Sequence, residues 1–123
     1  MRIIIKTPYG EVDGEIDETK NPVTAEKIIE SLPLNGRVSR WGEEIYFEIP
    51  VQVGEENSQE EVEVGDIAYW PPGNALCIFF GRTPVSTSEK PKAYSPVNVI
   101  GRVVDVSVLK KVQDGDDVLV KKV

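Results

Sequence analysis

The chain has 123 residues, and its 21 acidic against 14 basic side chains give a formal charge of −7. This length predicts a single domain spanning residues 1–123, large enough to bury one core. The acidic balance argues against a nucleic-acid partner, no apolar run is long enough to cross a membrane, and the lack of a signal peptide predicts a cytoplasmic location.

The N-terminal third predicts two strands and one helix. The strands are expected at residues 2–5 (RIII) and 11–17 (EVDGEID), on either side of a Pro-Tyr-Gly turn. The helix is expected in NPVTAEKIIESLP, capped by Asn21 or Thr24 and stopped by Pro33. Its apolar stripe must pack on a sheet or a barrel mouth, and it consists of Ala25, Ile28, Ile29 and Leu32.

The middle of the chain predicts four strands. Two are expected at residues 37–41 and 43–53, around a tight turn at Gly42. Two buried strands, DIAYW and ALCIFF, follow within residues 65–84, joined by a Pro-Pro-Gly-Asn turn. Residues 41–81 hold nine acids and no Lys or Arg, and five of the nine lie in EENSQEEVE. That segment predicts a solvated loop, and the alternative is an acidic rim that attracts a cationic partner.

The C-terminal third predicts a long loop and the closing strands. Residues 81–96 are rich in Ser, Thr, Pro and Lys, and loops of this length are often functional or mobile. Residues 96–112 predict a strand pair or one long strand bent at Gly101, and residues 118–123 predict the last strand. The expected fold is mainly β: a closed eight-stranded barrel with one short helix over one end.

The segments PVTAEKIIESLP, WGEEIYF, GDIAYWPPG and VIGRVVD occur in an order that resembles the cyclophilins, whose helix opens Pro-x-Thr-Ala-Glu. The chain is more similar still to small bacterial and archaeal cyclophilin-like domains of unassigned function, through WGEEIYF and WPPG. The resemblance covers residues 3–120 and implies an eight-stranded cyclophilin-like barrel with a peptide groove on one outer face. The chain departs from true cyclophilins because it has no His and different loops after Trp70 and Gly81.

Carried over position by position, the resemblance implies the site residues. Arg40 stands where the cyclophilin arginine hydrogen-bonds near the prolyl amide, and is the candidate catalytic residue. Tyr46 is the nearest counterpart of the pocket methionine. The other implied ligand contacts are Glu48 at the glutamine position, Ile78 or Phe79 at a pocket phenylalanine, and Asn98 or Val97 at the histidine position.

The residues themselves leave alternatives at these positions. A guanidinium group could withdraw electron density from an X-Pro amide and so help it across a barrier of about 18–20 kcal/mol. Arg40 could equally be a surface residue paired with a nearby glutamate. Trp41 and Trp70 each end a strand, and each could line a ligand or plug the core. Tyr69 and Trp70 must face opposite sides of their strand, and the outward one is the better ligand contact.

The missing His and the single Cys restrict the chemistry. They exclude Ser-His-Asp catalysis and an internal disulfide, and they leave only carboxylates for zinc. Cys77, in an apolar strand without a His partner, predicts a structural thiol. We expect no metal site and no cofactor. The composition, with no His, one Cys and one Met, fits a heat-adapted source.

Three functions therefore remain open. The first, which the sequence favours, is a module that binds a peptide or a small ligand without strong catalysis, because similarity of fold does not transfer chemistry. The second is a peptidyl-prolyl cis-trans isomerase of low or altered activity that uses Arg40. The third is an interaction subunit that docks to a partner protein through the loop at residues 82–96.

Overall fold

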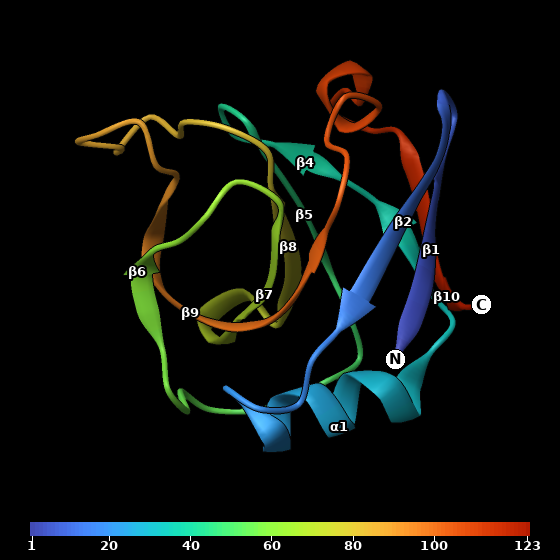
Figure 1. The fold of residues 1–123 in the computed structure, drawn as a ribbon, viewed down its shortest axis with the longest axis vertical. Coiled ribbons are helices and arrows are strands. Elements are labelled where there is room, and N and C mark those ends of the chain that lie inside the picture. The colour runs from blue at the N-terminus through green and yellow to red at the C-terminus, as the bar shows by residue number, and fades with distance from the viewer.

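A computed structural model describes all residues, 1–123, as an antiparallel β structure with one α-helix (Figure 1). The helix α1 spans Pro22–Ser31, and two single-turn 3-10 helices lie at Pro71–Gly73 (η1) and Leu109–Lys111 (η2). The strands are β1 (Arg2–Thr7), β2 (Gly10–Ile16), β3 (Leu34–Arg37), β4 (Ser39–Arg40), β5 (Glu44–Glu48), β6 (Gln59–Glu61), β7 (Asp66–Trp70), β8 (Ala75–Phe79), β9 (Lys92–Val103) and β10 (Asp117–Lys122).

The strands form one antiparallel sheet in the order β3-β10-β1-β2-β9-β7-β8-β5-β4, and β6 pairs with β9 beside this path. No hydrogen-bonded pairing joins β3 to β4, so hydrogen bonds do not close the sheet as the expected closed barrel requires. Only Val38 separates these two strands along the chain. The backbone of Val38 bonds to Asp116 and Gly115 in the turn before β10. One continuous segment, residues 34–40, thus borders both β10 and β5. Its division into β3 and β4, together with the additional strand β6, gives ten strands where eight were expected.

Side chains alternate between two apolar clusters on the two faces of β5, β7 and β8, as the period of a strand requires. The main core lies on the inner face, where Ile45, Ile67 and Ile78 join residues of β1, β2, β10 and α1. The second cluster lies on the outer face, under the first half of β9. It consists of Val62, Ala68, Ala75, Cys77, Phe79, Ala93, Val97 and Val99.

The helix forms as predicted at residues 22–31, but its N-terminus is satisfied differently. Asn21 and Thr24 were expected to cap it, yet the Asn21 side chain bonds to Val99 and Asn57 instead. The carboxylate of Glu56 accepts hydrogen bonds from the backbone N–H groups of Val23 and Thr24 at 3.2 Å each. The acidic segment, expected as a solvated loop, therefore stabilises the start of α1.

Several strand boundaries also differ from the prediction. β5 ends at Glu48 rather than at residue 53, and β6 forms inside the acidic segment. Residues 104–112 contain η2 rather than a strand. β9 is a single long strand, as one alternative predicted, and it begins at Lys92, inside the expected loop. At Gly101 a Cβ atom would lie 2.1 Å from the carbonyl oxygen of Glu15, so only glycine fits between β9 and β2 here.

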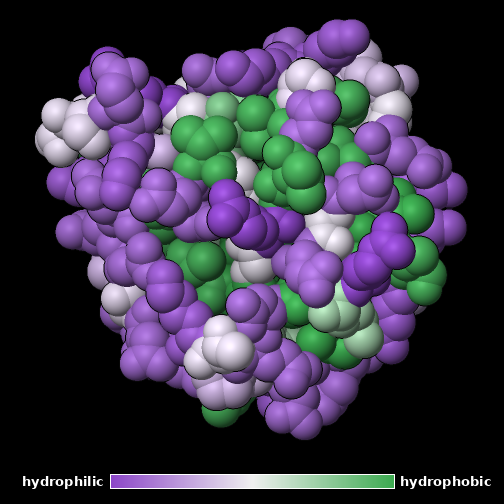
Figure 2. Space-filling view, in the orientation of Figure 1, coloured by the Kyte–Doolittle hydropathy of each residue, from purple (hydrophilic) through white to green (hydrophobic).

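The arrangement in Figure 1 places β6, β7, β8 and β9 around one side of the molecule and β1, β2 and β10 on the other, with α1 across one end. Figure 2 shows the same view with hydrophilic residues around the rim and hydrophobic residues visible between them. The only α-helix has ten residues, and no helix is long and apolar enough to cross a bilayer.

Candidate functional site

The candidate site starts at the turn between β4 and β5. Trp41 and Glu44 exchange two backbone hydrogen bonds, of 2.9 and 3.2 Å, around the two-residue loop Gly42–Glu43. Gly42 has a φ of +61°, the left-handed value that two-residue hairpin loops need and that glycine adopts without strain. Residues paired in this way point to the same face of a hairpin. The turn therefore sets the indole of Trp41 beside the carboxyl group of Glu44.

The second wall comes from the turn between β7 and β8. The indole N–H of Trp70 donates to Ser95 Oγ at 2.7 Å, which ties the ring to β9. Gly73, in the turn η1, lies directly against the ring, because a Cβ atom there would be 2.5 Å from two of its carbons. Tyr46 completes this wall. Its ring makes an edge contact with the ring of Trp70, with 6.3 Å between the two ring centroids and an interplanar angle of 71°.

The third wall is the first half of β9, which curves over the outer face of the sheet. Tyr94 is 72% exposed, although it is a large aromatic residue in a strand. Its ring makes edge contacts with Trp41 at 6.1 Å and with Trp70 at 6.2 Å, at interplanar angles of 77° and 90°. Tyr94 thus bridges the two tryptophans, which come from different hairpins.

Together these residues enclose a pocket of about 230 Å³. Glu44 is the only charged residue in its lining, which consists of Trp41, Glu44, Tyr46, Trp70, Ala93, Tyr94 and Val97. The volume exceeds the roughly 150 Å³ that holds a benzene molecule in an apolar cavity. It lies below the roughly 300 Å³ at which drug-sized pockets begin. The pocket therefore suits a group about the size of one ring.

The electrostatics of the pocket are set by Glu44. The residue is 6% exposed, and none of the five ion pairs in the structure includes it. Burial raises the pKa of its carboxyl group to about 7, and a hydrogen bond with the Cys77 thiol only partly opposes this. Burial, with the nearby Glu44, also raises the pKa of Cys77, which agrees with a structural thiol. Near neutral pH, Glu44 can exchange a proton.

The guanidinium group of Arg40, the candidate catalytic residue, bonds to backbone carbonyl groups. It donates to the carbonyl oxygens of Gly42, Lys110 and Val112 at 2.8–3.0 Å. The same group stacks over the ring of Phe80, 5.1 Å from the centroid. Arg40 is absent from the lining of the aromatic pocket. The expected pairing with a glutamate does not form either, because backbone carbonyls take these donors.

The other predicted contacts divide between pocket and interior. Tyr46 and Trp70 line the pocket. Of the neighbouring residues Tyr69 and Trp70, which point to opposite faces of β7, Tyr69 faces the core and Trp70 faces outward. Tyr69 is buried, with its hydroxyl group donating to the carbonyl oxygen of Val51 at 2.6 Å. Ile78 lies in the main core and Phe79 in the second cluster. The side chain of Glu48 is exposed at the far end of β5.

Asn98 is a structural residue rather than a pocket residue. Its side-chain N–H groups donate to Thr24 Oγ1 and to the carbonyl oxygen of Gly54, each at 3.0 Å. Its carbonyl oxygen accepts the backbone N–H of Glu56 at 3.0 Å. All of these bonds join β9 to the start of α1 and the acidic segment. Val97, the alternative at that position, does line the pocket.

Sequence reasoning missed Glu44, Ala93 and Tyr94. Glu44 was considered as part of the acidic cluster and as a possible partner of Arg40, but not as a pocket residue. The segment WGEE nevertheless contains the glycine-first turn that places it opposite Trp41. Tyr94 fell in the expected loop, and nothing local indicated that β9 would begin there. Trp41 was considered either to line a ligand or to plug the core, and the structure places it in the lining of the pocket.

With this geometry in view, the chain can be compared with known proteins. The family model described as Cyclophilin-like matches residues 1–121. The chain belongs to this cyclophilin-like family. The order of segments that first suggested the resemblance therefore reflects membership of this family. No curated protein matches the chain.

Two solved structures are similar to this cyclophilin-like chain. The solution structure of the hypothetical protein AF2241 from Archaeoglobus fulgidus is 44% identical, with a TM-score of 0.83, over 100% of this chain and 95% of that one. The structure of McbB in complex with tryptophan is 17% identical, with a TM-score of 0.75, over 98% of this chain but only 44% of that one. The second likeness shows the fold alone.

Proposed function

We propose that this protein binds a small ligand in the aromatic pocket between the Trp41–Glu44 turn and β9. The observation that carries the proposal is the convergence of four aromatic side chains, from three separate segments, on a hollow of about 230 Å³. Pockets lined mostly by apolar groups, with few and well-placed polar ones, are the usual form of a small-molecule site.

The exposure of the lining supports binding over core packing. Trp41, Tyr46 and Trp70 are each only partly buried, and Tyr94 is largely exposed. Large aromatic rings left open to solvent lose the free energy that their burial would provide, about 25 cal/mol per Å² of apolar area. A ligand that covers these rings recovers it. By contrast, the isomerase alternative gains no support from Arg40, because its donors already bond to backbone carbonyls.

The chain offers a direct optical test, since its only two tryptophans both line the pocket. A panel of neutral and charged compounds about the size of one ring should include members that change the tryptophan emission and raise the melting temperature. Replacing Tyr94 with Ala should weaken this binding by about fivefold or more, because an aromatic contact contributes about 1 kcal/mol.

Tyr9→Ala is the matched control for Tyr94→Ala. Tyr9 is also an exposed tyrosine, but it lies in the turn between β1 and β2 and is absent from the pocket lining. Its replacement should leave every affinity unchanged. The proposal is wrong if no compound of the panel, neutral or charged, alters the emission, or if Tyr94→Ala binds as well as Tyr9→Ala.

A further inference from the structure

The pocket combines one buried carboxyl group with aromatic rings set at right angles, and this combination indicates a class of ligand. The rings of Trp41, Trp70 and Tyr94 meet at interplanar angles of 77° and 90°, so they form the walls of a corner rather than a stack. Glu44 lies in the same lining. Building on the proposed function, we propose that the ligand is a small organic ammonium ion, held by these rings and by the Glu44 carboxylate.

The aromatic walls suit such a cation. An ammonium group within about 6 Å of a ring centroid is attracted by the negative face of the ring, most strongly for tryptophan. Several walls at right angles let one compact cation meet several ring faces at once. The ring-sized volume of the pocket, about 230 Å³, admits an ammonium group with methyl or short alkyl substituents.

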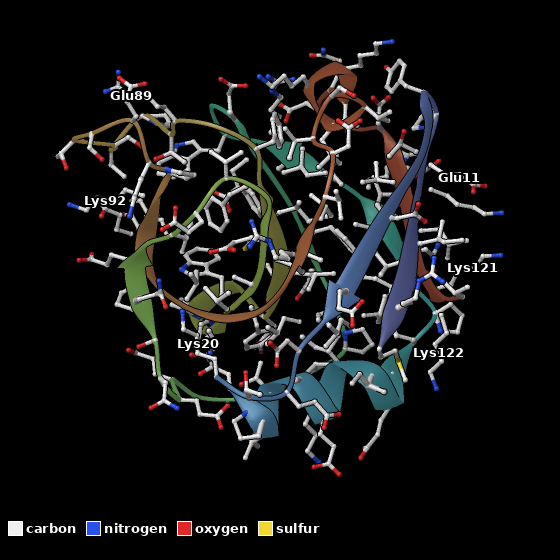
Figure 3. All side chains as sticks on the ribbon, viewed as in Figure 1. Glu11, Lys20, Glu89, Lys92, Lys121 and Lys122 are labelled. Atoms are coloured by element: carbon white, nitrogen blue, oxygen red, sulfur yellow. The ribbon has the colours of Figure 1, made fainter.

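The surrounding charges also favour a cation. No Lys or Arg lines the pocket, and none pairs with Glu44. Two basic groups lie at the turn itself. Lys110 pairs with Glu43 at 3.9 Å, and the Arg40 guanidinium group donates to the carbonyl oxygen of Gly42 at 3.0 Å without lining the pocket. Lys92 begins β9 two residues before Tyr94, but its side chain points away from the body of the molecule in Figure 3. Glu44 thus lacks a positive partner, and a bound ammonium ion would provide one.

The Cys77 thiol on β8 hydrogen-bonds with Glu44, and the other titratable residues in the pocket lining are Tyr46 on β5 and Tyr94 on β9. None of these groups can carry a positive charge. Ionisation of Glu44 therefore decides the charge of the pocket. Because burial raises its pKa to about 7, a cation must bind more tightly as the pH rises through that value.

The test compares choline with 3,3-dimethylbutan-1-ol, in which a carbon replaces the ammonium nitrogen. Calorimetry on the full chain should give about tenfold tighter binding of choline at about pH 8, from the cation–π and ionic contacts. Near pH 6, choline binding should weaken and release a proton, which is measurable as a dependence of the binding heat on the buffer. The neutral compound should show neither effect.

Glu44→Gln removes the charge while keeping the shape, and Glu48→Gln is its control on the exposed end of the same strand. The first variant should lose about tenfold in choline affinity and its pH dependence, while its affinity for the neutral compound is retained. The second should behave as the wild type. Equal binding of both compounds, unaffected by Glu44→Gln, would overturn this inference and leave the proposed function standing. If only neutral compounds bind, then this inference is likewise wrong and the proposed function stands. If neither neutral compounds nor cations bind, then the proposed function is wrong as well.

Discussion

At the scale of single residues, the burial of the Glu44 carboxyl group lowers the stability of the fold when that group is ionised. The unfolded chain leaves its carboxyl group in water, whereas the folded protein raises its pKa to about 7 by burial. The folded state therefore holds this proton more tightly than the unfolded state. Glu44 costs no stability at low pH, and it costs progressively more as the pH rises toward and through about 7.

We therefore predict that Glu44→Gln gains stability relative to the wild type as the pH is raised. Between about pH 5 and about pH 9 the difference in unfolding free energy should change by about 3 kcal/mol, which follows from the size of the pKa shift. Urea denaturation followed by far-UV circular dichroism measures it. Glu48→Gln should show no such change, and parallel curves for Glu44→Gln and wild type would contradict the explanation.

The direction and contacts of single side chains were only partly predictable from the sequence. The pattern of DIAYW correctly required that Tyr69 and Trp70 face opposite ways, but it did not tell which of them faces the core. Arg40 was placed by resemblance to a groove, yet its partners lie some seventy residues away, at Lys110 and Val112. A side chain as long as arginine can reach either side of its strand, so local sequence does not fix its contacts.

At the scale of elements, the turn η1 holds Trp70 in place. Gly73 lies so close to the indole that a methyl group would overlap two ring carbons. We predict that Gly73→Ala displaces the ring and lowers ligand affinity by about fivefold, as expected from the loss of one aromatic contact. Tryptophan emission and calorimetry report both effects.

Gly54→Ala is the control for this turn, because nothing lies within 4 Å of a Cβ atom built at Gly54. It should leave affinity and emission unchanged. If Gly73→Ala binds ligand like the wild type, then the close packing of η1 does not position Trp70 for binding.

The elements that could be predicted are those with a strong local pattern. The helix, DIAYW and ALCIFF carry such patterns, and each forms within a few residues of its expected place. β6 and the first half of β9 do not, because they are polar segments that become strands only by pairing with each other. Since the pocket is completed by that part of β9, its third wall could not be found from local sequence.

At the scale of the whole molecule, Arg40 connects the segment where the two ends of the sheet meet to the turn that follows η2. Its bonds to Lys110 and Val112 join residues far apart in the chain. We predict that Arg40→Ala lowers the free energy of unfolding by about 1–3 kcal/mol, as expected when hydrogen bonds from a charged group are lost. Ligand affinity should not change, because Arg40 does not line the pocket.

Arg37→Ala provides the comparison. Arg37 lies 3.9 Å from Asp117, and both side chains are more than 80% exposed, so the pair should contribute little. Denaturation midpoints of the two variants measure the difference. If Arg40→Ala instead loses ligand binding without losing stability, then the prediction is wrong and Arg40 contributes to binding.

The two faces of β5, β7 and β8 have a consequence for how the pocket can be changed by substitution. The same strands carry the main core on alternate residues, such as Ile45, Ile67 and Ile78, and carry the outer face on the residues between them. A change of side chain at Tyr46 or Glu44 therefore alters the lining of the pocket and leaves the side chains of the main core in place. Substitutions in the pocket can thus be made without repacking the main core, and at Glu44 they also change how stability depends on pH.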